Sequence, residues 1–144
     1  MKKTELSCGI IVFDGDKVLI VKHKGGHTSF PKGHKEKGEN LRETAIREVK
    51  EETGIDAEIE SNICFINTYD PNERIARKNK FLNRDKVFKD VLLFIGKKTG
   101  GELNPQLEEV SYCDFFTKEE ALEKLTYPID REMLEKAYKL RDGE

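Results

Sequence analysis

The sequence lacks tryptophan, has only three cysteines, and contains no apolar run long enough to span a membrane. Its first residues, MKKTELSCGIIVF, include two lysines, but the apolar run is short, ends at Asp14 and lacks a small-residue cleavage site. We therefore expect neither a signal peptide nor contact with a membrane, and we predict a cytoplasmic location.

The three cysteines, Cys8, Cys64 and Cys113, are odd in number, far apart and embedded in apolar runs. This pattern is typical of reduced thiols packed in a core, and it gives little support to a metal or catalytic role. The sequence also shows no internal repeat, low-complexity tract or linker. Its 144 residues predict a single domain, residues 1–144, with one sizeable core.

Charged residues make up 38% of the chain and apolar residues 36%, which indicates a polar globular protein rather than a disordered or fibrous one. The net charge of −2 conceals two segments of opposite charge. Residues 39–60 hold eight acidic and three basic side chains, a local net of −5, whereas residues 71–90 hold three acidic and seven basic ones, a local net of +4. If these segments meet, they could hold a cation beside a polyanion, although a solvated charged surface is the commoner explanation.

Five stretches have the composition of β-strands. Residues 6–23 predict a hairpin around the sequence DGD, because Gly15 can adopt a positive φ without steric cost. Residues 24–34 are punctuated by glycine and proline and predict a loop. Further strands are expected at residues 56–69, 86–98 and 111–116, and the second of these is so continuously apolar that we place it in the centre of the sheet.

Three segments have helical patterns. The first begins at Asn40, which with Glu43 forms a capping box, and it ends at Gly54. Its apolar stripe consists of Leu41, Ala45, Ile46 and Val49. Residues 117–125 begin with a second capping box, and a third helix starts at Pro128 with one apolar side formed by Ile129, Met133, Ala137 and Leu140. Helices that cover a mixed β-sheet predict an α/β fold with a three-layer α/β/α sandwich.

The first helix carries Glu48, Glu51 and Glu52 at positions i, i+3 and i+4, so their side chains share one surface. Like charges at these spacings destabilise a helix, and burial would raise at least one pKa. Arg47 and Lys50 could compensate as ordinary surface partners. A hard divalent cation such as Mg²⁺ is the alternative that we favour, because it prefers oxygen ligands and is often shared between carboxylates and substrate phosphates.

The turn before this helix has the composition of an anion-binding site. It is rich in glycine, leads into a helix N-terminus and carries four basic side chains, Lys32, His34, Lys35 and Lys37. Such loops are common, but together with a metal bound by carboxylates this one predicts a phosphate or pyrophosphate ester as the ligand.

The spacing of these residues resembles the Nudix box. Five residues separate Gly33 from Glu39, seven more lead to Arg47, and the sequence REVKEETGI follows with aliphatic residues at both required positions. The order of the flanking strands and helices is also similar to the Nudix fold. The resemblance implies hydrolysis of a nucleoside diphosphate linked to another moiety, with Mg²⁺ or Mn²⁺ as cofactor and a small nucleotide as the binding partner.

The resemblance also implies roles for individual residues. Glu48, Glu51 and Glu52 would bind the metal, Glu39 would support or join them, and Gly33 would contribute its backbone. Arg47 would hold the catalytic glutamates by salt bridges. Glu51 and Glu52 are the candidates for the general base. Glu109 could serve instead, because family members often use a glutamate beyond the box, although Glu108 is adjacent and an exposed role is equally ordinary.

The sequence FPKGH before the box resembles the branch of diadenosine tetraphosphate hydrolases, which implies phosphate contacts for Lys32 and His34. A tryptophan often found in that branch is Thr28 here. The basic segment, which includes Lys86, suits a tetraphosphate better than a mononucleotide. Aromatic residues available to stack on a base are Tyr69, Phe81 and Phe88, although strand aromatics are more often part of a core.

Other functions share the same box. A hydrolase of oxidised guanine nucleotides or an RNA 5′-pyrophosphohydrolase would use the same metal site, but the near-neutral charge and the lack of an interleaved basic and aromatic tract make binding to nucleic acid a weaker prediction. A nucleotide-sensing module without catalysis is the alternative of another class. The intact set of glutamates argues against it. We expect a monomer or a homodimer.

Overall fold

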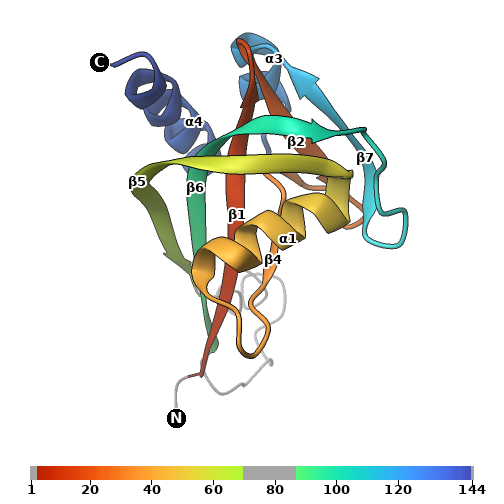
Figure 1. The fold of residues 1–144 in the computed structure, drawn as a ribbon, viewed down its shortest axis with the longest axis vertical. Helices are drawn as coiled ribbons and strands as arrows, with labels where there is room; N and C mark the ends of the chain where they lie inside the picture. Colours follow the sequence, from red (N-terminus) through yellow and green to blue (C-terminus); the bar gives the residue numbers. More distant parts are fainter. Residues whose placement is uncertain (1–2, 70–86, 144) are drawn as a thin grey trace, which may run out of the picture.

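The computed structural model describes residues 3–69 and 87–143. Within these ranges the chain forms a seven-stranded sheet flanked by helices (Figure 1). The elements are β1 (Lys3–Asp14), β2 (Lys17–His23), β3 (Thr28–Ser29), β4 (Lys32–His34), α1 (Leu41–Thr53), β5 (Ile55–Tyr69), β6 (Val87–Gly101), β7 (Val110–Phe116), α3 (Lys118–Lys124) and α4 (Pro128–Arg141).

The sheet is mixed. Its main path runs β3-β2-β1-β6-β5, while β4 pairs with β1 and β7 pairs with β2. Strands β1 and β6 are parallel over a long register from Lys3↔Val87 to Phe13↔Lys97, and the other pairs are antiparallel. The apolar β6 lies between β1 and β5, so it is an interior strand as its composition predicts, although β1 and not β6 occupies the middle of the path.

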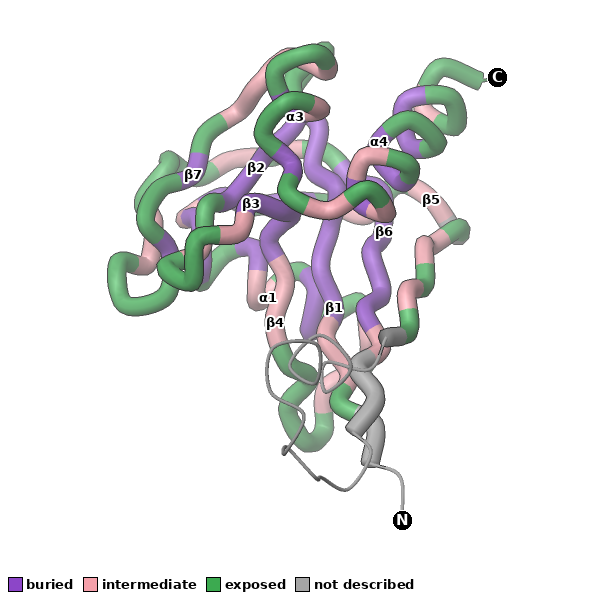
Figure 2. The backbone as a smooth tube through the Cα atoms, turned by 180° about the vertical axis from the view of Figure 1, so that it is seen from behind, coloured by how far each residue is buried: buried purple, intermediate pink, exposed green. Residues whose placement is uncertain are grey.

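Two hydrophobic cores lie on opposite faces of the sheet because successive side chains of β1 alternate between the faces. Ile11 and Phe13 pack with residues of α3 and α4, whereas Ile10 and Val12 pack with residues of α1. The buried segments of the chain therefore run through the middle of the molecule, and α3 and α4 lie on the outside of them in the view of Figure 2. The predicted α/β/α sandwich is confirmed.

The helix termini follow the predicted signals. Asn40 caps α1 by accepting a hydrogen bond from the Glu43 N–H, and Gly54 ends the helix with a φ of 79°. Thr117 forms the second capping box with Glu120, and Pro128 occupies the first turn of α4. The predicted hairpin is also present, with Phe13 opposite Val18 and Gly15 at a φ of 62°.

Three local predictions were wrong. The expected loop at residues 24–34 contains the short strands β3 and β4, because β1 and β2 offer free edges there for backbone pairing. Ile46 and Leu140, which we assigned to apolar helix stripes, are 41% and 39% exposed. Ile46 lies at the margin of the α1 stripe, and Leu140 lies in the last turn of α4, so neither residue is covered by the sheet.

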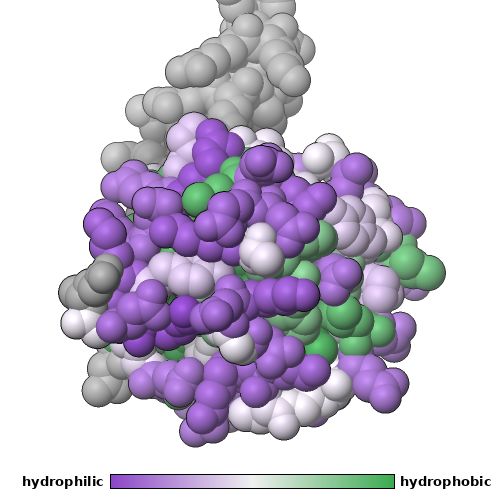
Figure 3. Space-filling model, turned by 90° about the horizontal axis from the view of Figure 1, so that it is seen from above, coloured by the Kyte–Doolittle hydropathy of each residue, from purple (hydrophilic) through white to green (hydrophobic). Residues whose placement is uncertain are grey.

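The surface and the thiols agree with the composition. Hydrophilic side chains cover most of the face seen from above, with a smaller apolar region to one side (Figure 3). Cys8 and Cys113 are buried and Cys64 is partly buried, and all three are free thiols. Within the described ranges, no helix combines the length and the apolar character needed to cross a membrane.

Candidate active site

Helix α1 brings the acidic residues together because its buried face is fixed against the sheet. Ala45 and Val49 pack into the core beside β1, so Glu48 and Glu52 project from the margin of the helix toward β4. Both ends of α1 are capped, which fixes the axial position of these carboxylates.

Arg47 is the centre of a hydrogen-bond cluster outside the buried face. Its guanidinium donates to Glu39 through Nε at 2.6 Å and through Nη2 at 3.0 Å. It also donates from Nη1 to Glu48 at 2.6 Å and to Glu51 at 3.1 Å, and from Nη2 to the carbonyl oxygen of His34 at 2.9 Å. The guanidinium therefore joins three glutamates to the turn before the helix.

Glu39 is the best-satisfied carboxylate of this cluster. Besides Arg47, it accepts hydrogen bonds from the Thr44 hydroxyl at 3.0 Å and from the Glu36 N–H at 2.9 Å. The hydrogen bonds from Arg47, followed by the one from Glu36, lower the pKa of Glu39 to about 2. Glu39 is thus held as an anion that orients Arg47 rather than as a group that exchanges protons near neutral pH.

Gly33 lies directly against Glu48. A Cβ atom at this position would overlap the Glu48 carboxylate, so only glycine lets the side chain lie against the backbone of β4. Burial is the main cause that raises the pKa of Glu48, and it outweighs the hydrogen bond from Arg47, which lowers it. Glu48 is therefore a partly desolvated carboxylate held between a cation and the chain.

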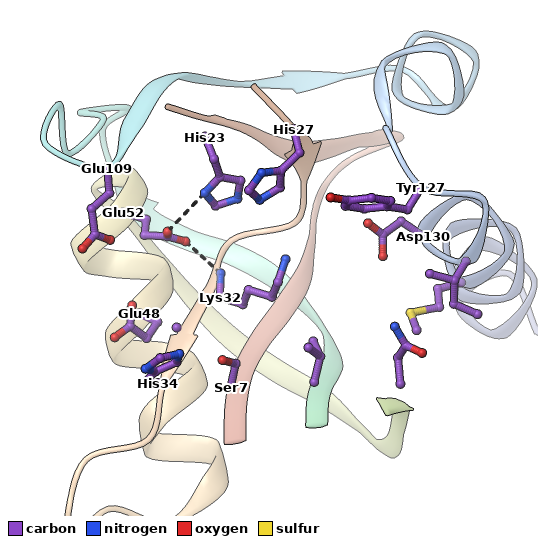
Figure 4. Close-up of a pocket in the computed structure, with 15 residues that line it drawn as sticks. Ser7, His23, His27, Lys32, His34, Glu48, Glu52, Glu109, Tyr127 and Asp130 are labelled. Atoms are coloured by element: carbon purple, nitrogen blue, oxygen red, sulfur yellow. Dashed lines mark hydrogen bonds and ion pairs between the residues drawn. The ribbon is translucent and has the colours of Figure 1, made fainter. Parts of the chain in front are cut away.

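Glu52 is almost completely buried, with a relative exposure of 2%. Its Oε1 accepts a hydrogen bond from the Lys32 backbone N–H at 2.8 Å, and its Oε2 lies 3.9 Å from Nδ1 of His23 (Figure 4). Burial raises the pKa of Glu52 to about 7, and the charges of Glu48 and Glu109 contribute in the same direction. A carboxyl group with such a pKa can exchange a proton near neutral pH.

A cavity of about 490 Å³ opens beside these residues. Glu48, Glu52 and Glu109 lie on one side of it, and Tyr127 and Asp130 at the start of α4 lie on the opposite side (Figure 4). The lining between them includes Lys32 and all three histidines of the chain, which are His23, His27 and His34. The cavity thus combines carboxylates, cations and flat rings, which are the groups that a metal–nucleotide complex requires.

Several of these lining residues were not identified from the sequence. His23 ends β2, His27 precedes β3, and the two imidazole rings stack with their centroids 4.3 Å apart and an interplanar angle of 14°. Tyr127, the N-cap residue of α4, lies with its ring centroid 6.0 Å from that of His27. Asp130 is 8% exposed. The one local signal for this part of the site is the pair of histidines on either side of the two glycines in KHKGGH.

The structure brings together some of the predicted site residues and not others. Lys32, Gly33, His34, Glu48, Glu52 and Glu109 all line the cavity. Glu39 and Glu51 instead lie around Arg47, and the Glu51 side chain is 49% exposed. Lys86 lies outside the described residues, as do Phe81 and the side chains of Tyr69 and Phe88, so their proposed contacts stay predictions.

The carboxylates on one side of the cavity are the kind of ligands that a hard divalent cation prefers. Within residues 3–69 and 87–143, no three His, Cys, Asp or Glu side chains form a ready-made metal site. Glu48 and Glu52 are nevertheless desolvated carboxylates that lie close enough for the charge of Glu48 to raise the pKa of Glu52, and Glu109 adds to this repulsion. A divalent cation between these carboxylates would remove the repulsion, and carboxylate oxygens are the ligands that Mg²⁺ and Mn²⁺ prefer.

The chain matches a known protein family over most of its length. The family described as the NUDIX domain matches residues 3–137. The chain belongs to the Nudix family. Members of this family generally use divalent metal ions.

Two curated relatives resemble this Nudix domain in sequence, a mutator protein and a tetraphosphatase. MutT4 of Mycobacterium tuberculosis, a putative mutator protein by its description, is 33% identical over 114 residues, which cover 79% of this chain and 42% of that protein. The asymmetrical bis(5′-nucleosyl)-tetraphosphatase of Mus musculus is 41% identical over 63 residues, which cover 35% of this chain and 43% of that protein. The chain spans less than half the length of the curated relatives that it matches.

Solved structures confirm the Nudix fold. An Ap4A hydrolase of C. elegans, in a binary complex, superposes with a TM-score of 0.76 at 21% identity, covering 97% of this chain and 99% of that one. A Nudix hydrolase from Nitrosomonas europaea superposes with a TM-score of 0.72 at 19% identity, covering 99% of this chain and 74% of that one. The mixed sheet with helices on both faces is therefore the fold shared with these proteins.

Proposed function

We propose that the chain is a pyrophosphohydrolase that hydrolyses a phosphoanhydride bond of a nucleoside polyphosphate with Mg²⁺ or Mn²⁺ as cofactor. The observation that carries this proposal is the cavity itself, in which Glu48 and Glu52 face the same space as Lys32 and His34. Carboxylates could hold the cation while the basic groups bind phosphate oxygens, so one cavity could hold both parts of a metal–polyphosphate complex.

Each residue has a role in this proposal. Glu48 and Glu52 would hold the metal together with Glu51, and Arg47 and Glu39 would keep the glutamates in place. A bound divalent cation would polarise the phosphoryl oxygens and neutralise the charge of the leaving phosphate. Glu52, whose pKa is raised to about 7, is the general base that we favour, with Glu51 and Glu109 as alternatives. Gly33 would contribute backbone, and Lys32, His34, Lys86 and Tyr69 would contact the substrate.

We propose diadenosine tetraphosphate as the substrate, cleaved asymmetrically by water into ATP and AMP. The FPKGH sequence before the box supports this choice, as does the 41% identity to the mouse tetraphosphatase over 63 residues. The local net charge of +4 in residues 71–90 also favours a ligand with many phosphates.

The metal site is tested by Glu52→Gln, which keeps the shape of the side chain and removes its negative charge. We expect this variant to lose metal-dependent release of ATP and AMP while its circular dichroism spectrum stays unchanged. Glu123→Gln, at an exposed position of α3, is the matched control and should retain full activity. Turnover by Glu52→Gln at the rate of the unmodified protein would refute the assignment of the metal site.

The substrate is tested by a panel with product analysis. We expect a higher kcat/KM for dinucleoside polyphosphates with four or more phosphates than for single nucleoside triphosphates, because Lys32 and the basic segment can neutralise more charge. Oxidised guanine nucleotides and an RNA with a 5′-triphosphate represent the other two candidate enzymes. Equal or reversed preference would move the assignment to one of these, and no hydrolysis of any substrate would favour a sensing module.

Two further proposals concern the cellular location of the protein and its oligomeric state. We propose a cytoplasmic enzyme, because the three free thiols suit a reducing compartment. A monomer or a homodimer stays our prediction for the oligomeric state, which sedimentation velocity would measure directly.

A further inference from the structure

The two oxygens of the Glu52 carboxylate have different surroundings. Oε1 is fixed by the Lys32 backbone N–H at 2.8 Å, whereas Oε2 faces Nδ1 of His23 at 3.9 Å (Figure 4). This separation is longer than a hydrogen bond, and such contacts in ligand-free active sites often shorten when the substrate binds. The position of Oε2 therefore depends on how firmly the His23 ring is held and on which nitrogen carries its hydrogen.

The His23 ring is held from its other nitrogen and from one face. Nε2 lies 3.1 Å from Oγ of Ser29, a residue with no exposed surface. His27 stacks on the ring at 4.3 Å, and the His23 backbone N–H donates to the His27 carbonyl oxygen at 2.9 Å across the connecting turn. The ring plane is therefore fixed by side-chain and backbone contacts together.

Lys32 contacts both Ser29 and Glu52. Its ammonium group donates to Oγ of Ser29 at 2.9 Å, and its backbone N–H donates to Glu52. Because Oγ accepts this hydrogen bond from the ammonium, the hydroxyl hydrogen remains available for the His23 ring nitrogen. The Phe30 carbonyl oxygen is the competing acceptor, but it lies at 3.3 Å from Oγ, farther than Nε2.

The direction of the hydrogen bonds decides between the two tautomers, because an ammonium group can only donate. A neutral imidazole has one N–H and one bare nitrogen. If Nε2 accepts from the Ser29 hydroxyl, it is the bare nitrogen, and the ring hydrogen lies on Nδ1, where it faces Oε2 of Glu52.

We propose that His23 is a positioning residue for Glu52, and that the Lys32, Ser29 and His23 side chains form a chain that presents the Nδ1 hydrogen of His23 to Oε2. This inference rests on the proposed function, in which Glu52 is the working carboxylate. Its effect is to fix Oε2 so that the remaining lone pairs of the carboxylate point into the cavity.

The tautomer can be measured without substrate or metal, at a pH well above the pKa of about 7 of Glu52, where its carboxylate is ionised. Long-range ¹H–¹⁵N correlation spectra of the protein labelled with ¹⁵N-histidine distinguish a protonated ring nitrogen from a bare one. The His23 signals are assigned by their loss in His23→Gln. We expect a protonated Nδ1 and a bare Nε2, and the reverse pattern would overturn the proposal. Because this measurement needs no turnover, its failure is distinct from failure of the proposed hydrolase activity.

Two variants of His23 test the effect on catalysis. The asparagine amide nitrogen is two bonds from Cβ, like Nδ1, whereas the glutamine amide nitrogen is three bonds away, like Nε2. We expect His23→Asn to retain most of kcat and His23→Gln to lose about tenfold, with KM unchanged in both, because outer contacts of an active-site ligand typically affect activity by about 10- to 100-fold. Equal losses in the two variants, or retention by His23→Gln alone, would overturn the proposal.

Discussion

At the scale of single residues, Arg47 and Glu52 show two ways in which the protein controls a carboxylate. Arg47 stabilises the ionised form of Glu39 by paired hydrogen bonds, so the pKa of Glu39 falls to about 2. Glu52 has one backbone donor and is buried, so its pKa rises to about 7. Two glutamates of the same motif therefore have opposite properties, one as a fixed anion and the other as a proton acceptor.

The raised pKa of Glu52 predicts a dependence of stability on pH. Between pH 4.5 and 7 the folded protein holds a proton on Glu52 that the unfolded chain has lost, so this residue makes the free energy of unfolding fall as the pH rises. Since one pKa unit corresponds to about 1.4 kcal/mol, the fall can reach about 3 kcal/mol. The measurement is urea denaturation in EDTA across this range.

The comparison with Glu52→Gln isolates this contribution. His23, whose pKa burial lowers to about 3, acts in the opposite direction between pH 3 and 6.5, because there the unfolded chain binds the extra proton. Because His23 lies against Glu52, both proteins of the comparison carry His23→Gln, which removes this contribution. The stability of His23→Gln relative to the His23→Gln, Glu52→Gln double variant should decrease from pH 4.5 to 7, and a constant difference would contradict the prediction.

The sequence was sufficient to identify the residues on α1 but not those across the cavity. Glu48 and Glu52 are close in sequence, so helical spacing alone places them together. His27 and Tyr127 are far apart in the chain, and they meet because Thr28 of β3 and Thr126, just before α4, exchange two hydrogen bonds. Tertiary contacts of this kind have no local sequence signal.

At the scale of elements, the sequence specifies the two ends of α1 more strongly than it specifies which of its side chains are exposed. Asn40 and Glu43 satisfy each other's backbone N–H groups at one end, and Gly54 adopts the left-handed conformation at the other. These signals depend on neighbouring residues only, so the sequence predicted both termini. Exposure at Ile46 depends on how far the sheet extends beneath the helix, which the helical periodicity cannot show.

Gly54→Ala tests the C-terminal end of α1. A Cβ at Gly54 would overlap the backbone carbonyl oxygen of Glu102, and the φ of 79° disfavours any side chain. We expect a loss of about 1 to 3 kcal/mol for the backbone conformation and a further loss for the overlap, measured by urea denaturation.

Gly38→Ala is the matched control for this substitution. Gly38 has a φ of 89°, but apart from its chain neighbours no atom of the described residues lies within 4 Å of the place that an added methyl group would occupy, so this variant incurs the conformational cost alone. The difference between the two variants measures the steric contribution. Equal losses would show that the close approach of residue 102 contributes nothing to the stability of α1.

At the scale of the whole molecule, the cavity is built from both sides of the sandwich. Glu48 and Glu52 come from α1, which packs on one core, and Tyr127 and Asp130 come from the start of α4, which packs on the other. The two cores position the two sides of the cavity relative to each other through the sheet. A ligand that bridges the cavity should therefore stabilise the whole fold.

A metal-binding experiment tests the carboxylate side of the cavity. A cation that binds only the folded protein raises its free energy of unfolding, by about 2.7 kcal/mol at roughly 100 times the dissociation constant. We expect Mg²⁺ or Mn²⁺ to raise the melting temperature of the unmodified protein, with a smaller rise for Glu52→Gln at matched ionic strength. Equal rises in the two proteins would indicate that the cation acts elsewhere.

The hydrogen bond from the Lys32 backbone to Glu52 makes the position of this carboxylate independent of the side chain at residue 32. Because the amide belongs to the main chain, nearly every replacement of the lysine side chain leaves that anchor in place, and only proline would abolish it. A descendant could thus exchange the ammonium group and acquire different ligand preferences without dismantling the carboxylate beside it. Such an arrangement allows selectivity to diverge while the chemistry is retained.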